Sequence, residues 1–281
     1  MTHARAAIAT LLLCAALAAP AWAQSAPNAT GSGSAGTAQG ALDAAIAGSW
    51  RLPNNRARDV YRHPAATLTF FGVQPEQTVI EIVPGGGWYS EILGPLLNDH
   101  GQYVAALFKP SSAGGERSVA ALKHKFSADP AHYGKARIVE IDAKAPVLGP
   151  AASADRVLTF RNVHNWTDDG TASAMFKAFF AVLKPGGVLG VVDHRAGTDT
   201  DVKDSGYLRT DDVIKLATDA GFKLEGSSEI NANPKDTKDY PKGVWTLPPT
   251  YALGDQDKAK YQAIGESDRM TLRFVKPAAT P

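Results

Sequence analysis

Two short segments place histidines and a carboxylate where they could act as bases or as ligands. His164 and Asn165 follow one β-rich run (RVLTF), and Asp193 and His194 follow another (VLGVV). Histidine changes its charge near neutral pH, so His164 is a candidate general base for a hydroxyl or an amine. His164, Asn165 and His194 form the predicted catalytic set.

Two histidines and a carboxylate also form a donor set that binds divalent metals. The same region supports a plainer alternative, in which His164 is a loop residue bonded to the backbone. The other side chains then form a charged hydrogen-bond network: Arg161, Asp193, His194 and Arg195. We favour the network and predict no metal.

A second chemical signal is the segment EIVPGGG, which runs from Glu81 to Gly87. Glycines between a strand and a helix let the backbone approach a ligand closely. No Gly-Lys-Ser/Thr follows, which excludes a phosphate-binding P-loop. The Glu81 carboxylate would repel a pyrophosphate, but it can accept hydrogen bonds from a cationic ligand such as S-adenosylmethionine. The alternative is a plain strand-turn-helix in which Glu81 bonds to local backbone or to an arginine.

The elements that must position these groups alternate between strands and helices. Continuous apolar strands joined by helical segments predict a doubly wound α/β domain with a mostly parallel sheet. Ligands bind at the carboxyl ends of such strands, where the loops above lie. The predicted strands are residues 78–83, 102–107, 137–141, 156–160, 188–192, 222–230 and 271–275. The predicted helices are residues 88–97, 115–126, 175–183 and 210–221.

The glycine segment, extended to EIVPGGGWYSEIL, resembles motif I of class I S-adenosylmethionine-dependent methyltransferases. More narrowly, it resembles a family of bacterial methyltransferases, often exported, with a Pro-Gly-Gly-Gly-Trp-Tyr signature. RARDVYRHP, RNVHNW, LKPGGVLGVVDHR and GESDRMTLRF match that family too. The resemblance implies a seven-stranded, Rossmann-like sheet whose last strand is antiparallel, with S-adenosylmethionine as the cofactor.

The resemblance also implies which residues bind the cofactor. Val83 stands where the motif has its first glycine, and the segment AALF after residue 104 lacks the acid that usually binds the ribose hydroxyls. Losing such a contact costs about tenfold or more in affinity. The candidate cofactor-binding residues are Glu81, Pro84, Gly85, Gly86, Gly87, Trp88, Asp142 and Arg161.

The composition narrows the classes of partner. The 281 residues include 29 Lys+Arg and 28 Asp+Glu, a formal charge of +1. This balance argues against binding nucleic acid or an anionic membrane through bulk charge. Cys14 is the only cysteine, so no internal disulfide forms. We expect a small-molecule substrate.

The N-terminus predicts export. A basic start, an apolar run and the sequence Ala21-Trp22-Ala23 are typical of a signal peptide over residues 1–23, cut before Gln24. The run is too short to span a bilayer stably. Residues 24–41 are rich in Ser, Gly and Ala and predict a flexible leader. We therefore expect a periplasmic or secreted protein.

The remaining residues, 42–281, form the predicted methyltransferase-like domain. An insertion at residues 231–269 separates the last two strands and is predicted to cap the acceptor site. The favoured function is methyl transfer from S-adenosylmethionine to a small or peptidic acceptor. The alternatives are a non-catalytic periplasmic binding protein on a decayed methyltransferase fold and, less favoured, a nicotinamide-dependent oxidoreductase.

Overall fold

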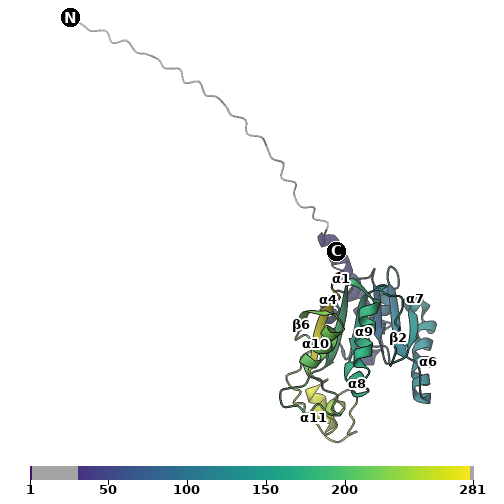
Figure 1. Cartoon of the computed structure of the whole chain (residues 1–281), viewed down its shortest axis with the longest axis vertical. Helices are drawn as coiled ribbons and strands as arrows, with labels where there is room; N and C mark the ends of the chain where they lie inside the picture. The colour runs from purple at the N-terminus through teal and green to yellow at the C-terminus, as the bar shows by residue number, and fades with distance from the viewer. Residues whose placement is uncertain (2–30, 279–281) are drawn as a thin grey trace.

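A seven-stranded sheet forms the centre of the computed structural model, which describes Met1 and residues 31–278 (Figure 1). The order across the sheet is β3-β2-β1-β4-β5-β7-β6. The strands are β1 (Thr78–Ile82), β2 (Gln102–Phe108), β3 (Arg137–Ile141), β4 (Ala154–Phe160), β5 (Leu183–His194), β6 (Lys223–Ser228) and β7 (Arg269–Val275).

The pairing confirms the predicted fold class. β3, β2, β1, β4 and β5 run parallel to one another, and β7 is antiparallel to both β5 and β6. The order reverses between β1 and β4, so the loops that follow these two strands leave the sheet side by side. A ligand site is expected at this point.

Helices cover both faces of the sheet and bury two apolar clusters (Figure 1). Alternate residues of β1 divide between the faces: Ile80 and Ile82 enter one cluster, and Val79 enters the other. The first face packs against α8 (Val163–Asp168), α9 (Ala172–Val182) and α10 (Thr210–Asp219). The second packs against α1 (Gly31–Ala47), α4 (Pro64–Phe70), α5 (Ser90–Leu97), α6 (Ala113–Ala128) and α7 (Pro130–Tyr133).

The start of the domain differs from the prediction. Helix α1 begins at Gly31, so the residues from 31 to 41 are helical instead of a flexible leader. Leu42 and Ala45 are buried, and Thr69 donates a hydrogen bond to Gln39 at 3.2 Å. These contacts hold the helix against the domain. The predicted signal peptide and the cut before Gln24 lie outside the described residues.

The fifth strand begins earlier than the predicted residues 188–192, because β5 includes the segment LKPGG from Leu183 onward. Leu183 pairs with Ala154, and the register shifts before Arg156 pairs with Val188. The irregularity accommodates Pro185 near the start of the strand, where a missing N–H is tolerated.

The predicted cap insertion lies beyond the sheet end where α8 also lies (Figure 1). It contains a 3-10 helix, η1 (Gly243–Thr246), and α11 (Lys258–Ile264). Two short helices, α2 (Pro53–Arg56) and α3 (Asp59–Arg62), precede α4. Within the described part of the chain, no helix is both long and apolar enough to cross a membrane.

Candidate active site

The glycine loop connects β1 to α5, and two of its glycines adopt the positive φ angles that favour glycine. Gly85 and Gly87 have φ of 58° and 80°. Val83, which replaces a glycine of the motif, also has a positive φ of 46°. A β-branched residue in this region is strained by about 1–3 kcal/mol. The surrounding fold therefore imposes the loop conformation on the valine.

Glu81 is held inside the protein at the end of β1. Its side chain is buried, and Oε2 accepts hydrogen bonds from Ser90 Oγ at 3.2 Å and from Tyr103 Oη at 2.5 Å. Burial raises the pKa of Glu81 to about 7, although the hydrogen bonds from Tyr103 and Ser90 oppose the shift. Near neutral pH this carboxyl group is therefore poised between its charged and neutral forms.

A cavity of about 230 Å³, here called the glycine-loop cavity, lies against this segment. A Cβ added at Gly85 or Gly86 would meet nothing within 4 Å, so these glycines leave room for a ligand. The lining includes six of the predicted cofactor-binding residues: Glu81, Pro84, Gly85, Gly86, Trp88 and Arg161.

The other two predicted cofactor residues do not line this cavity. The space next to Gly87 is filled by Leu122 and Ser90. Asp142 is exposed, and its Oδ1 accepts a hydrogen bond from the Lys144 backbone N–H at 2.8 Å. This arrangement matches a carboxylate that stabilises a turn.

Trp88 connects the glycine loop to the short N-terminal helices. Its Nε1–H donates to the Asn55 carbonyl at 2.8 Å. The guanidinium groups of Arg62 and Arg51 lie 4.8 and 5.2 Å from its ring centre, within the range of cation–π attraction. Trp88 therefore fixes Arg62 at the edge of the glycine-loop cavity.

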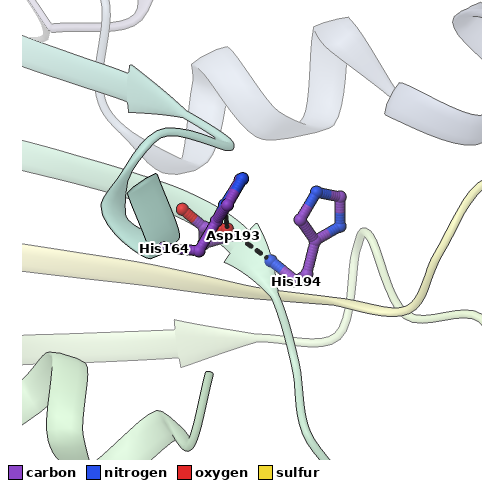
Figure 2. Close-up of side chains that lie close together, drawn as sticks. All are labelled: His164, Asp193 and His194. Carbon is purple, nitrogen blue, oxygen red and sulfur yellow. Dashed lines mark hydrogen bonds and ion pairs between the residues drawn. The ribbon is translucent and has the colours of Figure 1, made fainter. Parts of the chain in front are cut away.

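His164, in α8, and Asp193, near the end of β5, form a buried pair (Figure 2). His164 Nδ1 lies 2.9 Å from Asp193 Oδ1, which also accepts the His194 backbone N–H at 2.8 Å. The other carboxylate oxygen accepts the Val163 backbone N–H at 2.7 Å. A carboxylate accepts hydrogen bonds, so the neutral imidazole tautomer that fits this contact donates from Nδ1 and presents its Nε2 lone pair.

His194 is buried beside His164, with 5.1 Å between the ring centres. Its Nδ1 contacts Ser267 Oγ. Burial, with the positive charge of nearby Arg161, lowers the pKa of His194 well below its ordinary value of 6.5. His194 is therefore neutral at pH 7.

A second cavity of about 230 Å³, here called the histidine cavity, is lined by all three predicted catalytic residues, His164, Asn165 and His194. Val244, Trp245 and other residues of the cap insertion form another wall. Arg161 lines both this cavity and the glycine-loop cavity. The two candidate sites therefore meet at one side chain.

A larger, open basin of about 1250 Å³ lies outside the histidine cavity, between residues 197–205 and the cap insertion. Trp245 and Thr250 line both spaces. The basin contains none of the predicted site residues, but it offers a route by which a molecule could reach the histidines.

Comparisons with known proteins agree on the fold alone. No protein-family model matches the chain, and no curated protein matches its sequence. Solved structures do match it. A SAM-dependent methyltransferase from Aquifex aeolicus aligns over 85% of this chain and 98% of its own, with 13% identity and a TM-score of 0.54. This chain has the class I methyltransferase fold.

Two further structures show the breadth of this methyltransferase fold. A putative sarcosine dimethylglycine methyltransferase from Galdieria sulphuraria aligns over 80% of this chain and 88% of its own, with 11% identity and a TM-score of 0.53. The [4+2]-cyclase SpnF aligns over 83% and 85%, with 13% identity and a TM-score of 0.55. A name that describes a cyclase shows that this fold alone does not determine the reaction.

The predicted network around Asp193 forms only in part. Arg195 turns away from it and pairs with Glu229 and Asp268 at 2.7 and 2.9 Å. His194 lies near Asp193, and its backbone N–H makes the hydrogen bond. Arg195 lies just past the end of β5, where its backbone N–H donates to the Asp268 carbonyl at 3.0 Å, next to the acids that bind its side chain.

The metal alternative meets the distance requirement but not the requirement for free donors. Ligand atoms of His164, Asp193 and His194 all lie within 4.8 Å of one another. However, both Asp193 oxygens already accept N–H groups, and His194 Nδ1 bonds to Ser267. A divalent ion would have to displace these hydrogen bonds.

We therefore expect neither EDTA nor zinc chloride to change the thermal unfolding midpoint, because the three side chains are already satisfied by one another. Differential scanning fluorimetry measures this midpoint. A zinc-dependent rise that His194→Gln removes would instead establish a metal site.

Sequence reasoning missed two partners of the predicted residues. Tyr103, which bonds Glu81, lies on β2, and the pairing of Val79 with Tyr103 puts it on the same face as Glu81. Ser267 lies two residues before β7, which pairs with the end of β5. An in-register alignment of the predicted strands could have suggested the first partner, whereas the second depends on the conformation of the cap insertion.

Proposed function

We propose that this protein transfers a methyl group from S-adenosylmethionine to a hydroxyl or amine of a small acceptor. The observation that carries the proposal is the position of Arg161, which lines both the glycine-loop cavity and the histidine cavity. The glycine loop, which would bind the cofactor, therefore lies next to the pair formed by His164 and Asp193. Methyl transfer is an in-line displacement that depends on holding donor and acceptor together.

The residues of the glycine-loop cavity fit the amino-acid part of this cofactor. Gly85 and Gly86 leave open space, and Glu81 presents a buried carboxyl group to the same cavity. When bound, the cofactor supplies the electrophilic methyl carbon of its sulfonium group. Its adenosine part would extend beyond a cavity of about 230 Å³.

On the acceptor side, His164 acts as the general base. Its free Nε2 takes the proton of the acceptor hydroxyl or amine, and Asp193 stabilises the imidazolium that results. His194 stays neutral and occupies the adjoining wall, while Asn165 offers a polar contact. The acceptor enters from the basin beside Trp245.

One observation favours a second function, a binding protein that uses this fold for another ligand. Arg58, Arg62 and Arg161 all line the cavity where a cationic sulfonium would lie. Export, which the signal peptide predicts, would also place the protein outside the compartment that makes S-adenosylmethionine. The arginines would suit an uncharged or anionic ligand, and export would favour a ligand other than this cofactor.

Titration calorimetry with S-adenosylmethionine and S-adenosylhomocysteine tests the proposal. We expect both to bind, and we expect Gly86→Leu to weaken binding at least about tenfold by filling the cavity. Gly86 has no positive φ and no neighbour within 4 Å of an added Cβ, so this variant should remain folded. No heat from either nucleoside at high micromolar concentration would contradict methyl transfer and favour the binding protein.

A further inference from the structure

Arg161 combines a strained backbone conformation with a guanidinium group that has no hydrogen-bond partner among the residues that the structure describes, and packing of the fold explains neither feature. It follows β4 with a φ of 62°, a conformation that non-glycine residues adopt at a cost. Its backbone N–H donates to the Val192 carbonyl at 2.7 Å, which fixes the position. Among residues 36–278, its guanidinium group takes part in no hydrogen bond or ion pair, and the main attraction it receives comes from the charge of Glu266 at longer range. Strain of this kind collects at binding sites.

The neighbouring arginines are also short of negative partners. Glu266 alone accepts ion pairs from Arg58, Arg62 and Arg269, at 2.7, 3.2 and 3.3 Å. Burial would raise the pKa of Glu266, but these arginines together lower it to about 2. Glu266 is therefore fully ionised and already shared by three cations.

Two guanidinium nitrogens beside the glycine-loop cavity are buried without a partner. They are Nη2 of Arg58 and Nη2 of Arg62, and the Arg62 side chain is only 5% exposed. Burial, followed by repulsion from Arg161, lowers the pKa of Arg62 to about 10, so it keeps its charge at pH 7. A buried cation with an unsatisfied donor gains much from an anionic ligand.

The other acids near the cavity do not neutralise this charge. Glu81 is bonded to Ser90 and Tyr103, and Asp193 is bonded to His164 and to backbone N–H groups. They do, however, make the region unfavourable for a ligand with several negative charges. The arrangement suits one small anion with a single charge.

We infer that Arg161, together with Arg62 and Arg58, binds the carboxylate of a ligand at the junction of the two cavities. A carboxylate accepts two parallel hydrogen bonds from a guanidinium group, which fixes its orientation. The inference deepens the proposed function, on which it rests for the nucleoside ligand. The carboxylate can belong to the amino-acid part of the cofactor or to the acceptor, and the two sources are separable.

The experiment compares three probes on the purified protein and on Arg161→Gln by titration calorimetry in low-salt buffer. S-adenosylhomocysteine carries a nucleoside and a carboxylate, 5′-methylthioadenosine lacks the carboxylate, and benzoate lacks the nucleoside. The matched control is Arg56→Gln, because Arg56 is an exposed arginine that lines neither cavity.

We expect Arg161→Gln to weaken the binding of at least one carboxylate-bearing probe, S-adenosylhomocysteine or benzoate, about 10- to 100-fold. Weaker S-adenosylhomocysteine binding with unchanged 5′-methylthioadenosine binding assigns the carboxylate to the cofactor. Weaker benzoate binding alone assigns it to the acceptor. Equal affinities of Arg161→Gln and the unmodified protein for both carboxylates, or no carboxylate binding at all, overturn the inference. If benzoate binds through Arg161 but neither nucleoside binds, the inference stands and the proposed function fails.

Discussion

At pH 8, Glu81→Gln should be more stable than the unmodified protein, by about 3 kcal/mol in the free energy of unfolding. The reason is that burial raises the pKa of Glu81 from an ordinary 4.5 to about 7, so ionising the folded protein is costly. Ser90 and Tyr103 both donate to the same oxygen, Oε2. The carbonyl oxygen of glutamine can accept both bonds, so the variant loses only the charge.

The sign of the pH dependence follows from the direction of that shift. Below about pH 4.5 the carboxyl group of Glu81 is protonated in the folded and the unfolded protein. Between pH 4.5 and 7 the unfolded chain ionises first, so stability falls as the pH rises. The difference between Glu81→Gln and the unmodified protein should therefore grow from near zero to its full value across this window.

Chemical denaturation at pH 4.5, 6 and 8 measures the difference. Glu140→Gln is the control, because Glu140 is exposed on β3 and pairs with Lys123 at the surface. It should keep the pH slope of the unmodified protein. A Glu81→Gln variant with that same slope would show that Glu81 ionises normally in the folded state.

The same substitution should reduce ligand binding, because Glu81 lines the glycine-loop cavity. A neutral amide cannot form a charge-assisted bond with a ligand ammonium group. More stability and weaker binding in one variant would identify Glu81 as a group kept for function at a cost in stability.

Local patterns predicted the strands well because each apolar run is buried and bounded by glycine, proline or charged residues. The antiparallel direction of the last strand followed from the resemblance rather than from these patterns. The start of α1 escaped prediction, because residues 31–41 are rich in Gly and Ser, whereas the burial of Leu42 and Ala45 in the same helix depends on the folded domain. Tertiary packing here outweighs a poor local propensity.

The candidate site was predictable where it depends on strand ends and unpredictable where it depends on distant pairing. His164 and His194 follow neighbouring parallel strands, so their proximity follows from the topology. The pairing of Arg62 with Glu266 joins residues 204 positions apart. No local pattern identifies such a partner, and the charge excess around Arg161 therefore became visible only in the folded protein.

The largest effect on catalysis should come from His164→Gln. Removing a general base from a proton transfer lowers turnover about 10²- to 10⁴-fold. The substitution leaves the glycine-loop cavity intact, since His164 does not line it. On an acceptor identified by release of S-adenosylhomocysteine, kcat should fall while the KM for the cofactor stays constant.

Asp193→Asn tests the same base through its partner. An asparagine amide that donates to His164 Nδ1 would move the imidazole proton to Nε2 and block proton uptake there. His132→Gln is the matched control, because His132 also bonds an aspartate, Asp129, at 2.7 Å but lines neither cavity.

Unchanged turnover in His164→Gln would show that His164 is not the general base. Methyl transfer would then depend on positioning alone, which the meeting of the two cavities at Arg161 could still provide.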